Sequence, residues 1–120
     1  MTLVDTSVWV NHFRRPQSSL IKLLEDFSAG IHPFVIGELA CGNLKDRALT
    51  LGDLAKMPEA PLATEAEVLH LLESRRLWGQ GLGWVDVHLL ASALLGGWDL
   101  LTADRAIERA ARRLGIMCPE

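Results

Sequence analysis

The stretch "MTLVDTSVWV", residues 1–10, decides the fold, because a short apolar run ends there at an acidic residue. The run "TLV" predicts a buried strand. Helical spacing from Thr6 onward, with Val10 and Phe13 on one face, predicts a helix directly after it. Asp5 stands at the junction. Since a carboxylate is rarely buried unless something pairs with it, Asp5 is either a helix cap or part of a site.

The composition indicates an ordinary folded protein. The chain has 120 residues, 49% of them hydrophobic and 22% charged, which predicts one domain over residues 1–120 with a substantial core. A net charge of -3 provides no overall basic surface for nucleic acid. Cys41 and Cys118 lie far apart without a CxxC pattern, as expected of reduced thiols in the cytoplasm. The longest apolar stretch, "LLASALLGGW", is too short to span a bilayer.

Short apolar strands alternate with helices along the rest of the chain. Besides the first strand, the pattern predicts strands at "IH" (31–32), "DLLTA" (99–103) and "IMC" (116–118), and helices over 18–30, 33–42, 44–57, 64–79, 84–97 and 104–115. Thr64 and Glu67 form a capping-box pattern at the clearest of these helices. Such alternation predicts an α/β fold with a central parallel sheet flanked by helices in three layers.

Four carboxylates interrupt apolar surroundings. Asp5 follows "TLV", Glu38 is the only charge in "PFVIGELACG", Asp86 is the only formal charge in "WVDVHLLASALLGG", and Asp104 follows "DLLTA". Each has an ordinary structural interpretation. Asp5 and Asp104 suit helix N-caps, and Asp86 suits the positive end of a helix dipole. Glu38 could simply point outward.

Taken together, the four acids favour a shared site. Residues at the carboxyl ends of parallel strands gather along one edge of the sheet, so Asp5 and Asp104 are expected to meet there, near Asp86. Carboxylates that converge in a poorly solvated crevice repel one another unless a divalent cation lies between them. Ligands that are all oxygen favour magnesium or manganese over zinc.

Four segments carry a family resemblance: "LVDTSVW", "GELACG", "GWVDVHLLASALL" and "LLTADRAI". In this order and spacing the chain resembles a PIN domain, and more narrowly the VapC-type ribonuclease toxins of bacterial toxin–antitoxin pairs. The resemblance covers essentially the whole chain, and all four acidic positions of the family pattern are filled. Only the middle, "KDRALTLGDLAKMPEAPLAT", has no matching motif.

The resemblance implies a metal-dependent endoribonuclease that uses Mg²⁺ or Mn²⁺ and leaves 5′-phosphate and 3′-hydroxyl ends. It implies that Asp5 and Asp86 bind the metal directly and that Asp104 is a third ligand or orients a second ion and its waters. It implies that Glu38 acts through a water or supports the ligands from behind them. It also implies RNA as substrate, a VapB-type antitoxin as partner, and a homodimer. The apolar faces of the first helix and of residues 44–57 could supply an antitoxin groove, or could be ordinary core.

Other interpretations stay open at this point. One is a solitary PIN nuclease that processes RNA, and another is a PIN-like module that only binds. A third is a magnesium-binding receiver domain, which would need paired acids after the first strand and a late lysine, whereas no lysine follows Lys56. The hydroxyls of Thr6 and Thr102 could serve either a helix cap or the acidic site. Arg105 and the four tryptophans are not assigned a role.

Overall fold

Three short parallel strands form the centre of the fold in the computed structural model, which describes residues 1–119. They are β1 (Thr2–Val4), β2 (Ala29–Gly30) and β3 (Asp99–Leu101), in the order β2-β1-β3. Both neighbours pair with β1 in parallel, so that Leu3 lies between Gly30 and Leu100. The strand that comes first in the sequence is therefore the centre of the sheet.

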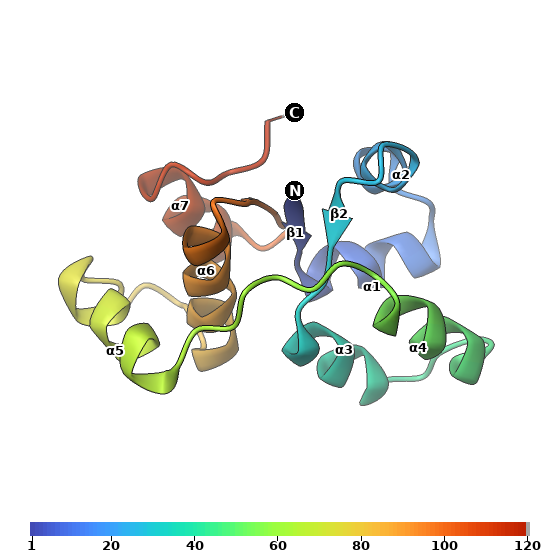
Figure 1. The fold of residues 1–120 in the computed structure, drawn as a ribbon, viewed down its shortest axis with the longest axis horizontal. Coiled ribbons are helices and arrows are strands. Elements are labelled where there is room, and N and C mark those ends of the chain that lie inside the picture. The colour runs from blue at the N-terminus through green and yellow to red at the C-terminus, as the bar shows by residue number, and fades with distance from the viewer. Residues whose placement is uncertain (120) are drawn as a thin grey trace.

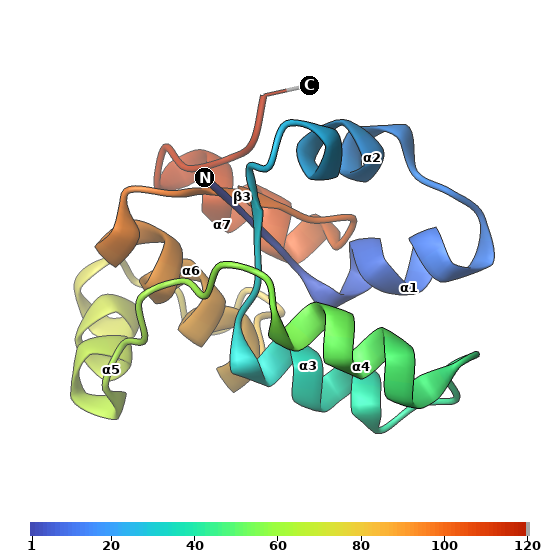
Figure 2. The ribbon, with the colours of Figure 1, turned by 45° about the vertical axis from the view of Figure 1, so that its right-hand side comes forward.

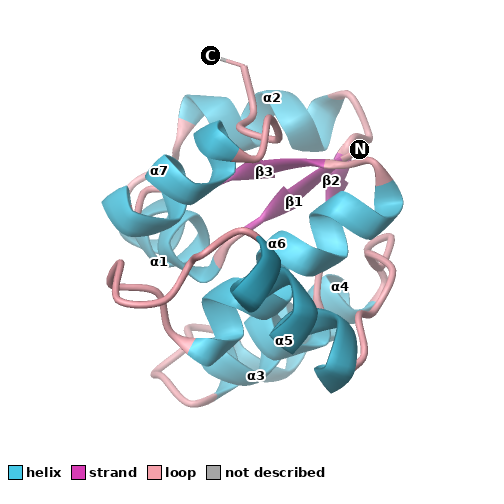
Figure 3. Cartoon of the chain, turned by 90° about the vertical axis from the view of Figure 1, so that its left-hand side faces the viewer, coloured by secondary structure: helices cyan, strands magenta, loops and turns pink. Residues whose placement is uncertain are grey.

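Helices lie on both sides of this sheet, as Figures 1 and 3 show. They are α1 (Thr6–Arg14), α2 (Ser18–Glu25), α3 (Pro33–Ala40), α4 (Arg47–Ala55), α5 (Glu65–Ser74), α6 (Trp84–Gly96) and α7 (Arg105–Arg113). In Figure 2, β1 runs directly into α1. The predicted α/β fold, with a parallel sheet flanked by helices, is confirmed.

Burial of apolar side chains explains why β1 and α6 lie at the centre of the protein. Leu3 and Val4 of β1 are completely buried, as the uninterrupted apolar run predicts for a central parallel strand. In α6 the consecutive residues Val87 to Ala93 are all buried. A helix that is apolar on nearly every side has to lie inside the protein, and α6 packs between the sheet and α5.

Two predicted strands are placed differently in the structure. The second strand is Ala29–Gly30, not residues 31–32, because His32 already caps α3 and Ile31 forms only an isolated bridge with Glu59. At "IMC", Met117 forms an isolated bridge with Leu100 and no strand develops. Single bridges leave no periodicity in a sequence, so pattern alone does not locate them.

Several helices are shorter than predicted. The second helix ends at Glu25, well before Gly30, because Phe27 adopts a left-handed conformation with φ of 54°. Similarly, α5 ends at Ser74, just before the left-handed Arg76. The capping box of Thr64 and Glu67 is confirmed at the start of α5. No helix within residues 1–119 is long and apolar enough to cross a membrane.

Candidate carboxylate site

Asp5 is a buried carboxylate at the junction of β1 and α1. Its side chain is only 4% exposed. Ser7 donates to it twice, from its backbone N–H to Oδ1 at 2.8 Å and from its hydroxyl to Oδ2 at 2.9 Å. The hydroxyl of Thr102 also donates to Oδ2. Asp5 therefore caps α1, as its ordinary interpretation predicts, but it also bonds across the sheet to the end of β3.

Two hydroxyl groups connect the ends of β1 and β3. The Ser7 hydroxyl, which donates to Asp5, accepts the backbone N–H of Ala103 at 2.9 Å. The Thr102 hydroxyl, which also donates to Asp5, accepts the backbone N–H of Asp104 at 3.0 Å. Ser7 was not singled out in the sequence. Its position two residues after a capping aspartate, where a backbone N–H bonds to the cap, is the signal that could have found it.

Asp86 and Asp104 each use one carboxylate oxygen to cap their own helix. Asp86 Oδ2 accepts the N–H of Gly83 at 2.7 Å, and Asp104 Oδ1 accepts the N–H of Ile107 at 2.9 Å. The second oxygen of each carboxylate lies outside these capping bonds. Helix capping and membership of a site are therefore compatible for both residues.

Glu38 reaches toward the start of α1 from the last turn of α3. Its Oε1 accepts the hydroxyl proton of Thr6 at 2.6 Å. This answers the question left open about Thr6, because Asp5 caps α1 while the Thr6 hydroxyl holds Glu38. Glu38 is exposed, as its ordinary interpretation allows, and it also hydrogen-bonds to Thr6.

The negative charges of the other three acids act on Asp86. The pKa of Asp86 is raised, first by burial and then by the negative charges of Asp104, Asp5 and Glu38, against the lowering effect of the Gly83 N–H. Within residues 1–119, none of the four forms an ion pair with lysine, arginine or histidine. The site thus gathers negative charge from β1, α3, α6 and α7 without a protein cation to neutralise it.

The chemistry of these donors fits a hard divalent cation. Every candidate ligand atom here is a carboxylate or hydroxyl oxygen. Such oxygen ligands suit Mg²⁺ or Mn²⁺ better than Zn²⁺. As the side chains are placed, no group of three or more histidine, cysteine or acidic residues in the described part of the chain is arranged to hold one ion. The mutual repulsion at Asp86 is the observation that favours a cation there.

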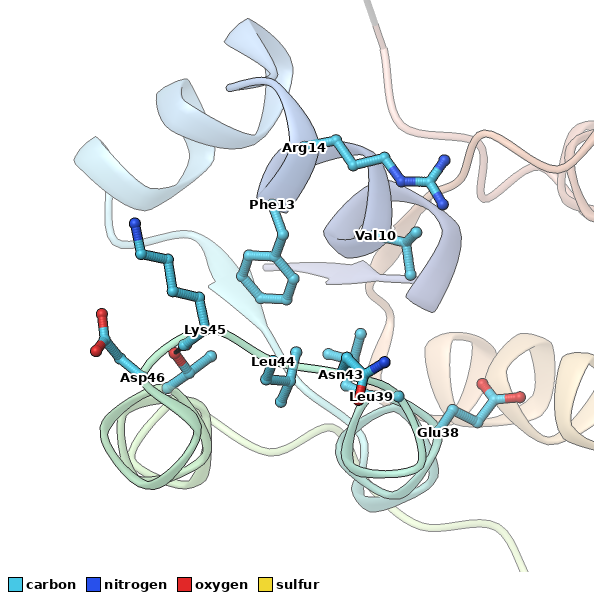
Figure 4. Close-up of a pocket in the computed structure, with 11 residues that line it drawn as sticks. Val10, Phe13, Arg14, Glu38, Leu39, Asn43, Leu44, Lys45 and Asp46 are labelled. Atoms are coloured by element: carbon cyan, nitrogen blue, oxygen red, sulfur yellow. Dashed lines mark hydrogen bonds between the residues drawn. The ribbon is translucent and has the colours of Figure 1, made fainter.

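A cavity of about 680 Å³ begins at Glu38 and runs between α1 and the α3–α4 connection (Figure 4). Val10, Phe13 and Leu39 give it apolar walls, while Arg14 and Lys45 bring positive charge. Phe13 is 44% exposed. This cavity is the groove between the first helix and residues 44–57 that the sequence suggested as one possibility.

The tryptophans differ in their exposure. Trp9 is buried in the core, and Trp98 is half-buried against it. Trp78 and Trp84 are exposed by 54% and 43%. Arg105, the first residue of α7, is exposed beside Asp104.

Comparisons with known proteins agree with this geometry. The PIN domain family model matches residues 2–113. Ribonuclease VapC32 from two strains of Mycobacterium tuberculosis, CDC 1551 / Oshkosh and H37Rv, is 48% identical over 121 residues, which cover all of this chain and 98% of the relative. The crystal structure of PAE2754 from Pyrobaculum aerophilum has the same fold, with a TM-score of 0.55 at 20% identity over 95% of this chain and 88% of that one.

Proposed function

Because the chain belongs to the PIN domain family, among the VapC ribonucleases, we propose that it is a metal-dependent endoribonuclease and the toxin of a type II toxin–antitoxin pair. Residues 1–120 would form a single nuclease domain that acts on RNA in the cytoplasm. One observation supports this function above all: the negative charges of Asp5, Glu38 and Asp104, from distant parts of the chain, act on Asp86.

Each acid has a proposed role in binding the cation. Asp5, Asp86 and Asp104 would hold Mg²⁺ or Mn²⁺ through their oxygens, and Glu38 would hold a water in place, since its Oε1 is already oriented by Thr6. The bound ion supplies Lewis-acid chemistry, which offsets the negative charge of the phosphodiester and makes water a stronger nucleophile. Attack by water would leave 5′-phosphate and 3′-hydroxyl ends.

The hydroxyl groups have a positioning role in this scheme. Ser7 and Thr102 donate to Asp5 and thereby orient its carboxylate without neutralising it. The same two hydroxyls accept N–H groups from Ala103 and Asp104, so they also hold the end of β3 against Asp5. Removing bulk water from Asp5 strengthens its interaction with a cation, because the local dielectric is low.

Two partners follow from membership among the VapC ribonucleases. A VapB-type antitoxin would occupy the groove that begins at Glu38, because its walls combine apolar side chains with charges of both signs, which suit an amphipathic peptide. A peptide in this groove would cover the approach to Glu38 and so inhibit cleavage. A homodimer is the proposed oligomeric state.

Substitution of the acids tests the proposed function. Asp5→Asn and Asp86→Asn should abolish Mn²⁺-dependent cleavage of RNA while the circular dichroism spectrum stays that of the native fold, because asparagine keeps the shape and the capping oxygen but not the charge. The exposed Asp26, at the end of α2, provides the matched control, since Asp26→Asn should cleave normally. Undiminished cleavage by either site variant would overturn the assignment.

A further inference from the structure

A row of four aromatic side chains connects the beginnings of α3 and α6. His32 packs on Phe34 with ring centroids 4.9 Å apart, and Phe34 packs on His88 at 4.9 Å. His88 packs in turn on Trp84 at 4.8 Å, edge to face with 86° between the planes. The proposed cleavage mechanism uses none of these four rings.

The two histidines are buried and the other two rings are open to solvent. His32 and His88 are 2% and 5% exposed, whereas Phe34 and Trp84 are 40% and 43% exposed. His32 Nδ1 accepts the backbone N–H of Phe34 at 3.0 Å, which fixes the start of α3. The buried histidines therefore restrain Phe34 and Trp84. Because these two side chains are already ordered, they would lose little entropy when a flat ligand packs on them.

These two rings lie close to the acidic site. Phe34 precedes Glu38 by one helical turn on the same face of α3. Trp84 shares the first turn of α6 with Asp86. Neither helix contains lysine or arginine, so neither offers a cation to an RNA phosphate. On these two helices, attraction for RNA beyond that of the bound cation therefore has to come from contacts with the bases.

We propose that Phe34 and Trp84 form a stacking platform for the bases of single-stranded RNA beside the cleaved phosphate. This inference rests on the proposed ribonuclease function. Stacking on aromatic rings is favourable for every base, so the platform would bind RNA with little sequence preference of its own. A second copy of the chain fits less well, because a stable interface buries about 800 Å² on each partner, far more than two partly exposed rings supply.

Binding measurements with and without bases test the platform. Phe34→Leu and Trp84→Leu are made in the non-cleaving Asp5→Asn protein, and the probe is a random pool of fluorescein-labelled single-stranded RNA 12-mers with Mn²⁺ present. Each substitution should weaken binding about tenfold. With a 12-mer of abasic ribose phosphate the same substitutions should have no effect. Trp78→Leu, at an exposed tryptophan outside the ring row, is the matched control and should match its parent with both probes.

Three results would overturn the platform. They are equal losses with the abasic probe, unchanged binding of the base-containing RNA, and a change of oligomeric mass in sedimentation without a change in RNA affinity. The last would assign the rings to contact between copies. Cleavage of the same pool by the native chain, measured in parallel, separates this proposal from the proposed function. Cleavage without an effect of the ring substitutions rejects the platform alone, whereas a native chain that neither binds nor cleaves the pool rejects both.

Discussion

Asp5 shows how a single residue serves the fold and the site together. It caps α1, yet it also accepts hydrogen bonds from two hydroxyls, one of which lies 97 positions away. All three donors are neutral, so its charge stays available to a cation. A buried carboxylate without an ion pair is costly in a protein that has no other use for it. Its surroundings are therefore better explained by a site than by capping alone.

Thr102 provides a test of the positioning role. Thr102→Val removes the hydroxyl that joins Asp5 to the N–H of Asp104 and keeps the branched shape. Cleavage should fall about 10- to 100-fold, as is typical when a group that orients a metal ligand is lost. The rate of RNA cleavage and the Mn²⁺ concentration for half-maximal activity are the measurements. Thr102→Ser, which keeps the hydroxyl, should restore both, and equal losses in the two variants would contradict the positioning role.

His32 predicts how stability depends on pH. Burial, followed by the charge of His88, lowers the pKa of His32 from 6.5 to about 4. The unfolded chain therefore takes up a proton at higher pH than the folded one, so stability should fall as the pH decreases from about 6.5 to 4. The loss should reach up to about 3 kcal/mol. Urea unfolding at pH 7 and pH 4 measures it.

Two variants provide the comparison for this pH effect. His32→Asn keeps a side-chain acceptor for the N–H of Phe34 but cannot titrate, so its stability should change less between the two pH values. The exposed His70 is the control, and His70→Asn should behave as the native protein does. An equal loss in His32→Asn and the native chain would show that another group titrates.

The four acids stand out in the sequence because each is isolated in an apolar stretch, and the structure places three of them where their charges act on Asp86. Their hydroxyl partners could be predicted only in part. Thr6 and Thr102 drew attention as neighbours of acids, but their bonds to Glu38 and Asp5 depend on how α1, α3 and the strands come together in space. The row of four aromatic rings depends in the same way on the contact between Phe34 of α3 and His88 of α6. Spacing within either helix does not reveal this contact.

Among the secondary-structure elements, β2 was the least predictable. It has only two residues, and small side chains there give no apolar pattern. The helices were predictable, since stripes and caps persist over two or more turns. Their ends were less so, because Phe27 and Arg76 adopt left-handed conformations that are uncommon outside glycine.

Gly30 of β2 offers a test at this scale. A Cβ at this position would overlap the six-membered ring of Trp98 and lie 3.1 Å from the carbonyl oxygen of Pro58. Gly30→Ala should therefore lower the free energy of unfolding by about 1–3 kcal/mol. Gly37→Ala is the matched control, because a Cβ added at this position in α3 would have nothing within 4 Å. It should raise stability by about 0.5–1 kcal/mol. Equal effects in urea unfolding would refute the close approach of Trp98.

At the scale of the whole molecule, the site joins segments from both ends of the described chain. Asp5 follows β1, Glu38 lies on α3, and Asp86 and Asp104 begin α6 and α7. A cation held by Asp5, Asp86 and Asp104 is expected to stabilise the entire fold, since it binds the native state alone.

Metal addition tests this coupling. Mn²⁺ at 100 times its dissociation constant should stabilise the native chain by about 2.7 kcal/mol, seen as a higher melting temperature. Asp86→Asn should lose most of this gain. Without metal it should melt above the native chain at neutral pH, because a raised pKa means that the ionised carboxylate disfavours the folded state. A metal-induced rise that persists in Asp86→Asn would argue against this residue as a ligand.

The central position of β1 has a consequence for synthesis on the ribosome. Residues 2–4 emerge early, but β3, the partner that brings Thr102 and Asp104 to Asp5, spans residues 99–101. Until that segment has left the exit tunnel, the middle strand of the sheet lacks one neighbour and the acids cannot assemble. A growing chain that has not yet released β3 therefore cannot place Thr102 and Asp104 beside Asp5, so these groups come together only late in folding, after the first strand and helix can already have formed.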